Sequence, residues 1–130
     1  MPKHTEFKVG GVPEHFNLPW KKAIEKNRFA THAIDVTWKD YGGGTGAMTK
    51  ALREGSLDIA ILLTEGIIAD IHHGNQSKIV QFYVKSPLRW GVHVTADSAF
   101  KSINDLKDSR AAISRYGSGS HLMAYVNADN

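Results

Sequence analysis

Apolar residues in the first half of the chain follow two spacings in turn, one typical of strands and one typical of helices. Residues 7–12 and 33–38 show the two-residue alternation and β-branched content of strands. Residues 57–63 are almost continuously apolar, as in a strand that is buried on both faces. Amphipathic helices are predicted over 19–29, 45–54 and 65–73, the third with Thr64 as its N-cap. This order predicts parallel strands joined by helices.

The second half of the chain is predicted to add elements of the same kind. They are strands at 78–84 and 89–95 around a turn at 85–87, a short helix at 102–107, a strand at 110–114, and a final helix from near Ser120 to the chain end. The sequence therefore predicts an α/β fold, a three-layer sandwich with a mostly parallel central sheet.

A glycine-rich turn at residues 42–46 joins the second predicted strand to the second predicted helix. Such a turn directs backbone N–H groups and the positive end of a helix at one spot, where an anion can bind. Thr49 stands where a dinucleotide fingerprint needs its third glycine, and no Lys-Ser or Lys-Thr pair follows to complete a P-loop. The alternative is a purely structural turn that needs glycine for positive φ.

Composition narrows the class of protein. The chain has 130 residues, 42% hydrophobic and 22% charged, with a net charge of +3, which fits one soluble globular domain. Its scattered basic residues predict no nucleic-acid surface, and no cysteine is present to form disulfides or thiolate metal sites. No apolar run approaches the ~20 residues that a membrane-spanning helix needs, so we expect no membrane insertion.

The first six residues bear on the cellular compartment. They lack the apolar region of a secretory signal peptide. We expect the protein in the periplasm if a signal peptide has been removed, and in the cytoplasm if Met1 is the native start.

Histidines and serines give little sign of metal or catalytic chemistry. His72 and His73 are adjacent, so they point to different faces of a helix, and the other histidines lack partners at ligand spacing. Ser118 lacks the G-x-S-x-G elbow of a hydrolase, because Tyr116 stands two residues before it. We expect no catalytic residue, no metal and no cofactor.

Several short motifs resemble those of one protein family. They are residues 11–16 (GVPEHF), 43–48 (GGTGAM), 51–55 (ALREG), 57–60 (LDIA), 64–66 (TEG) and 105–107 (DLK). Their order and spacing resemble the type II periplasmic substrate-binding proteins, in the branch with the nitrate, sulfonate and taurine receptors of ABC transporters and the thiamine-pyrimidine synthases. The resemblance runs from about Phe7 to Val126, and Asp108 departs from the glycine that is usual in the family.

The resemblance implies a two-lobe protein that closes on a small ligand like a hinged trap. Residues 1–109 would form the first α/β lobe. Residues 110–130 would form the crossover strand and first helix of a truncated second lobe.

Loops after the strands are the expected ligand site, because open parallel sheets bind ligands beyond the carboxyl ends of their strands. The resemblance assigns ligand contact to Thr45 and Gly46 and implies that the turn at 118–120 faces them. The candidate ligand-binding residues are His15, Phe16, Gly44, Thr45, Gly46, Thr64, Glu65, Ser118, Gly119 and Ser120. Structural alternatives are a hydrophobic staple for Phe16, an N-cap for Ser118 and a helix-dipole carboxylate for Glu65. Tyr83 and Trp90 are expected in the core.

The predicted function is a solute-binding protein that captures a small anionic or zwitterionic organic ligand for an ABC-type importer. The alternatives are a thiamine-pyrimidine biosynthesis enzyme on the same scaffold, which the lack of cysteine disfavours, and a cytosolic ligand sensor. The expected partners are a small molecule and an ABC permease. An unpartnered second-lobe strand also predicts strand- or domain-swapped association of the truncated chain.

Overall fold

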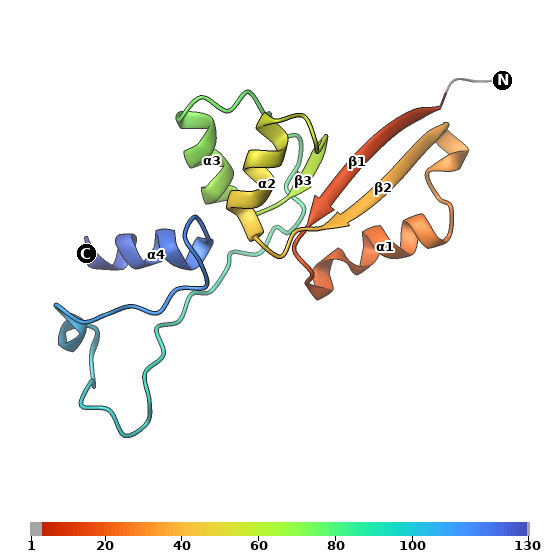
Figure 1. Ribbon diagram of the computed structural model, residues 1–130. Helices are drawn as coiled ribbons and strands as arrows, with labels where there is room; N and C mark the ends of the chain where they lie inside the picture. The colour runs from red at the N-terminus through yellow and green to blue at the C-terminus, as the bar shows by residue number, and fades with distance from the viewer. Residues whose placement is uncertain (1–3, 130) are drawn as a thin grey trace.

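The computed structural model describes residues 4–129, so Met1 and the last residue of the predicted final helix lie outside the described residues. Its centre is a parallel sheet of three strands in the order β2-β1-β3 (Figure 1). The strands are β1 (Thr5–Gly11), β2 (Ile34–Asp40) and β3 (Ile59–Ile61). Val9 of β1 lies opposite Trp38 of β2 on one side and Ile59 of β3 on the other. This arrangement confirms the predicted α/β class and its parallel sheet.

Helices cover both faces of the sheet, as the three-layer prediction requires. α1 (Leu18–Glu25) joins β1 to β2, and α2 (Gly44–Arg53) joins β2 to β3. Successive residues of a strand face opposite sides of a sheet, and two glycines of β1 show what each side holds. A Cβ on Gly10 would meet the Tyr41 ring at 2.6 Å, on the α2 side, and a Cβ on Gly11 would meet Asn17 at 2.6 Å, just before α1. The side chains of Tyr41 and Asn17, which precede α2 and α1, therefore lie so close to the middle strand that glycine is required there.

The core lies between β1 and α2. Met48 of α2, which is fully buried, clusters with Tyr41, Ala51 and Leu57. The other buried apolar residues in the described part of the chain are Val9 of β1, which is fully buried, and Ile67 of α3. On the other face, the ring of Trp20 in α1 lies between those of Phe29 and Trp38, with centroid distances of 5.7 and 6.1 Å.

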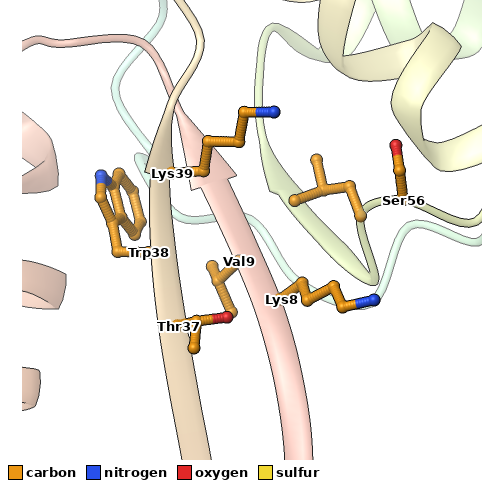
Figure 2. Close-up of a pocket in the computed structure, with 7 residues that line it drawn as sticks. Lys8, Val9, Thr37, Trp38, Lys39 and Ser56 are labelled. Carbon is orange, nitrogen blue, oxygen red and sulfur yellow. The ribbon is translucent and has the colours of Figure 1, made fainter.

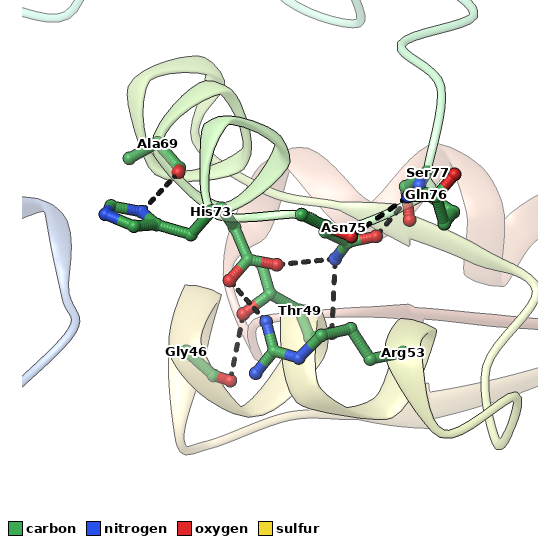
Figure 3. Close-up of polar contacts among 10 residues, drawn as sticks. Gly46, Thr49, Arg53, Ala69, His73, Asn75, Gln76 and Ser77 are labelled. Carbon is green, nitrogen blue, oxygen red and sulfur yellow. Dashed lines mark hydrogen bonds and ion pairs between the residues drawn. The ribbon is translucent and has the colours of Figure 1, made fainter.

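α3 (Thr64–His72) packs beside α2 and is joined to it by polar contacts (Figure 3). Arg53 of α2 forms an ion pair with Asp70 of α3. Asn75, only 5% exposed, donates through Nδ2 to Asp70 and to the Thr49 carbonyl, and its Oδ1 accepts from the Ser77 amide at 2.8 Å. One buried amide thus connects the end of α3 to α2.

Several predicted boundaries in this half were wrong. α1 ends at Glu25 rather than residue 29, because Asn27 adopts a left-handed conformation with a φ of 54°. Thr64 is the first residue of α3 and Leu63 is its N-cap, with no side-chain cap hydrogen bond. β3 is shorter than the predicted 57–63. Two 3-10 helices, η1 (His15–Asn17) and η2 (Ala30–His32), were not predicted.

Residues 78–115 lie largely in an extended path that leaves the sheet and returns to α4 (Gly119–Ala128) near α3 (Figure 1). The predicted strands at 78–84, 89–95 and 110–114 are not formed, because these residues have no neighbouring strand to share a hydrogen-bond ladder. The predicted helix at 102–107 is the 3-10 helix η3 (Ile103–Leu106).

Most apolar side chains of this extended path are exposed. Val80 is 87% exposed and Phe82 is 62% exposed, and the predictions of core positions for Tyr83 and Trp90 were wrong, since both are exposed by more than 40%. The chain exposes 10111 Å², whereas a compact monomer of this size exposes about 6,800 Å². The first half is therefore a packed α/β unit, and the second half mostly lacks a surface to pack on.

Candidate functional site

Four helices begin around one cavity of about 1500 Å³. One part of it lies beyond the carboxyl ends of the three parallel strands, where loops that leave those strands line it, and another part runs along β3, α1 and residues 77–88. Seven of the ten predicted ligand-binding residues line it: His15, Phe16, Thr45, Thr64, Glu65, Ser118 and Gly119. Gly44, Gly46 and Ser120 stand next to these residues in the chain without lining the cavity. The structure thus brings loops from both halves of the chain to one place.

The glycine-rich turn is held against the loop before α4. Gly44 has a φ of 65°, which disfavours any residue with a Cβ, and a Cβ there would overlap the guanidinium of Arg115. A Cβ on Gly46 would lie 3.7 Å from the carbonyl oxygen of Gly117. The turn therefore needs glycine both for its conformation and for close approach of Arg115.

Arg115 is the functional candidate that sequence reasoning missed. Its Nη1 donates to Ser114 Oγ at 2.7 Å, whereas its Nε is buried without a hydrogen-bond partner. No carboxylate in the described part of the chain forms an ion pair with Arg115. Its position after a predicted strand was a usable signal, but its contact with Gly44 depends on the tertiary fold.

Two further glycines allow the helix starts to meet. A Cβ on Gly66 of α3 would lie 2.5 Å from Thr45 Cγ2 of α2, and a Cβ on Gly119 of α4 would overlap Leu63. The Trp90 ring lies 2.9 Å from the same Gly119 position. The first turns of α2, α3 and α4 are therefore packed directly together.

Ser118 and Ser120 serve the start of α4. Ser118 is the N-cap, and its Oγ accepts from the His121 amide and donates to the Arg115 carbonyl at 2.7 Å. Ser120 Oγ lies 3.0 Å from Ser118 Oγ and accepts from the Ser114 amide. Ser118 is thus the helix N-cap that was its structural alternative to ligand binding. The hydroxyls of Ser118 and Ser120 also hold the loop that carries Arg115.

Two residues that line the cavity each have one buried side-chain oxygen without a hydrogen-bond partner. Glu65, in the first turn of α3, has a buried Oε1 with no hydrogen bond. Asn17 is fully buried, and its Nδ2 donates to the Val12 carbonyl at 2.7 Å while its Oδ1 has no partner. Buried polar groups without partners are costly, so unpartnered ones on a cavity wall suit a bound polar molecule.

Aromatic side chains border the same cavity. The rings of His15 and Phe16 are 4.6 Å apart, and Phe16 is 38% exposed. Tyr83 Oη donates to the Phe16 carbonyl, and burial raises the pKa of this hydroxyl. The extended segment is thereby tethered to the loop after β1, and the cavity has an apolar as well as a charged part.

A second hollow, of about 360 Å³, lies along β1 and β2 rather than beyond their ends (Figure 2). Trp38, Lys39 and Lys8 leave the strands in different directions there. Because its polar groups do not converge, this hollow lacks the arrangement of a ligand site.

No cluster of three histidine or acidic side chains is arranged to hold a metal ion within residues 4–129. Among those same residues, no helix combines the length and the apolarity needed to cross a membrane.

One solved structure is similar to this chain over nearly its whole length. It is the Candida albicans CA3427 gene product, described as defining a new family with the generic periplasmic binding protein structural fold. The identity is 34% and the TM-score 0.82, over 96% of this chain. The chain spans 41% of the length of that structure. No protein-family model and no curated protein matches. The α/β unit described above therefore has the fold of a lobe of a periplasmic-binding-protein-like protein.

Proposed function

We propose that this chain belongs to a solute-binding protein that captures a small anionic or zwitterionic organic ligand. The observation that best supports this proposal is the cavity where four helices begin. The guanidinium of Arg115 lies on its wall and forms no ion pair with a described carboxylate. Helix starts and guanidinium groups both favour negatively charged ligand groups. The similarity to a protein with the periplasmic binding protein fold supports the same proposal.

The cavity wall is formed by two parts of the chain, and the proposed mechanism depends on both. Thr45 and Glu65 belong to the predicted first lobe, and Arg115, Ser118 and Gly119 belong to the predicted crossover into a second lobe. A ligand that contacts both would stabilise the closed arrangement in proportion to its differential affinity. The proposal includes a non-enzymatic role, an ABC permease as partner and the nitrate, sulfonate and taurine branch of receptors. It includes a periplasmic location if a signal peptide precedes the mature chain.

A thermal-shift screen against sulfonates, nitrate, amino acids and pyrimidines tests the proposal. A ligand at a hundredfold its Kd stabilises the folded state by about 2.7 kcal/mol, which is readily detected. Stabilisation by one anionic or zwitterionic class supports the proposal. Turnover of the stabilising compound would make the protein an enzyme instead, and stabilisation only by cations would contradict the proposed site.

Self-association of the 130-residue chain is a separate part of the proposal. The cavity extends between β3 and the unpaired residues 77–88, whose apolar side chains are exposed. Extended apolar segments beside an open sheet edge favour strand pairing or swapping between copies. Sedimentation velocity is expected to show concentration-dependent dimers, and a clean monomer at all concentrations would contradict this part.

A further inference from the structure

His121, in the first turn of α4, contacts the loop that carries Arg115. Its Nδ1 lies 3.2 Å from the amide nitrogen of Gly117. A backbone amide can only donate, so this Nδ1 is an unprotonated acceptor, and the proton of the neutral ring sits on Nε2. The hydrogen bond therefore exists only while the His121 side chain is uncharged.

His73 provides the opposite case in the same protein (Figure 3). Its Nδ1 lies 2.7 Å from the carbonyl oxygen of Ala69, which can only accept, so this Nδ1 carries the proton. Protonation of the other ring nitrogen leaves that hydrogen bond intact. Of these two histidines, only His121 loses its backbone contact when it becomes charged.

Gly117 links the His121 ring to the start of α2. Gly117 has a φ of 75°, which favours glycine, and a Cβ on it would lie 3.7 Å from Gly46 Cα. Arg115, two residues earlier in the same loop, lies where a Cβ on Gly44 would be. The bond from Gly117 to His121 therefore helps to hold this loop, and Arg115 with it, against the first turn of α2.

Other hydrogen bonds of the loop join groups that keep their protonation states between about pH 5 and 8. The Ser118 amide and hydroxyl both donate to the Arg115 carbonyl, and Ser120 Oγ accepts from the Ser114 amide. Histidine is the side chain whose ordinary charge change falls in that range. Loss of the His121 contact alone should therefore loosen the loop without unfolding it.

Neighbouring groups keep a charged His121 ring in place without restoring its bond. The Tyr116 and Tyr125 rings lie 5.3 and 5.1 Å from the imidazole, within the range of a cation–π contact. The positive end of α4 and the Arg115 guanidinium oppose the charge. No carboxylate of the described residues forms an ion pair with His121.

Two further elements meet the start of α4 and carry titratable side chains. α3 packs against α4, and the segment around Trp90 meets Gly119, whereas the first turn of α2 has no titratable group. The titratable and charged side chains of α3 and of the Trp90 segment are Glu65, Asp70, His72, His73, Arg89 and His93.

We propose that His121 is a pH-sensitive positioning residue, which holds Arg115 at the cavity when it is neutral and releases it when it is charged. This rests on the proposed solute-binding function and adds regulation of the same site. One hydrogen bond changes an equilibrium constant by about three- to tenfold. Ligand affinity should therefore fall by about that factor from pH 8 to pH 5.

NMR of the ligand-free 130-residue chain tests the contact directly. Long-range ¹⁵N correlations in the imidazole ring distinguish the two neutral tautomers. At about pH 8 we expect the Nε2–H tautomer at His121 and the Nδ1–H tautomer at His73. On acidification, the Gly117 amide and the Arg115 Cζ signal should shift together with the titration of His121. The Nδ1–H tautomer at His121, or a Gly117 amide that does not follow it, would overturn the inference.

Methanesulfonate is the ligand probe, because it keeps one negative charge throughout this pH range. Its Kd is measured from the Gly46 and Gly117 amide signals at about pH 8 and pH 5. We expect the Kd to be about three- to tenfold higher at the lower pH. Tighter binding at the lower pH would mean that the His121 charge attracts the anion directly, and the inference would be wrong.

Variants separate the hydrogen bond from the charge. His121→Phe keeps a ring between the two tyrosines without an acceptor, so it should bind as weakly at both pH values as the acidified wild type. His121→Asn places an amide oxygen near the Nδ1 position and does not titrate, so it should bind tightly at both. The control His73→Asn should keep the wild-type pH dependence. A pH dependence that survives in both His121 variants would belong to another group and overturn the inference.

The outcomes for the two proposals are distinct. If methanesulfonate binds equally well at both pH values, the proposed function stands and the inference is overturned. If neither methanesulfonate nor any screened compound binds while Gly117 and Arg115 follow His121, the positioning of Arg115 is supported and the solute-binding function is contradicted.

Discussion

Residues 5–75 and residues 78–115 carry similar hydrophobic patterns, but the first range is packed into an α/β unit and the second is largely exposed. Val9 and Val80 both stand in segments whose β-branched and aromatic residues predict strands, yet Val9 is fully buried and Val80 is 87% exposed. Val9 belongs to a strand with a hydrogen-bonded neighbour on each side, and the segment of Val80 has none. A strand-like apolar pattern therefore forms a strand only where another strand can share its hydrogen bonds and a helix can cover its apolar side chains.

Paired truncations of one core and one extended-segment residue give the largest expected contrast. Met48→Ala removes a fully buried side chain between β1 and α2 and should lower the free energy of unfolding by about 2–5 kcal/mol. Val80→Ala should change it by less than about 0.5 kcal/mol. Urea unfolding of both variants checks the difference, and a cost for Val80→Ala comparable to that of Met48→Ala would remove the contrast.

Asn75 tests whether the buried polar contacts at the end of α3 form the boundary of the packed region, residues 5–75. Asn75→Ala removes three polar contacts between α3, α2 and the chain that leaves α3, and should cost about 1–3 kcal/mol. Gln76→Ala is the control, because its exposed side chain forms a local hydrogen bond to the Gly74 carbonyl. Equal unfolding midpoints for the two variants would show that the buried network is not a boundary of the packed region.

Gly44 tests the contact between the two regions. Gly44→Ala should cost about 1–2 kcal/mol because of its left-handed backbone, and its Cβ should displace Arg115 and weaken ligand binding. Gly42→Ala adds the same methyl group where no atom lies within 4 Å. Thermal unfolding and ligand titration of both variants measure the effects. Unchanged ligand affinity in Gly44→Ala would show that Arg115 does not contribute to ligand binding.

The smallest expected effect is a pH response within the second region. Backbone N–H bonds from Lys101 and Ser102 hold the pKa of Asp105 below its ordinary value, so this carboxylate stabilises η3 when it is ionised. A lowered pKa gives stability above the unfolded value that is lost as the pH falls below about 4. Amide signals of Lys101 and Ser102 should lose protection over that range, and Asp105→Asn should abolish the pH dependence. A persistent response in Asp105→Asn would assign it to another group.

These two regions also show which structural features local sequence patterns predict and which they do not. The parallel sheet, the alternation of strands and helices and the start of α2 follow from local patterns, such as the glycines before Thr45. The strands at 78–84 and 89–95 did not form, because pairing depends on a neighbour that the pattern itself does not supply. Seven predicted residues share one cavity because all follow strands or start helices. Their ligand contacts stay predictions.

Arg115 and Asn17 show the limit of the same reasoning at the site. Asn17 is a common residue type at a helix start, so its full burial and free Oδ1 are visible only after η1 folds under β1. Arg115 is recognised as a site residue only through its contact with Gly44, which lies far away in the sequence. Both depend on long-range packing, which no local spacing encodes.

Hydrogen–deuterium exchange of the 130-residue chain, with and without the tightest compound from the screen, tests most directly whether a packed lobe holds the ligand at its helix starts. Without ligand, we expect slow exchange in β1, β2 and α2 and fast exchange across residues 78–115. With ligand, we expect new protection at residues 44–46, 64–66 and 115–121. Slow exchange at 78–84 without ligand, or ligand protection confined to the strand hollow around Lys8 and Lys39, would contradict a ligand site at the helix starts of a packed lobe.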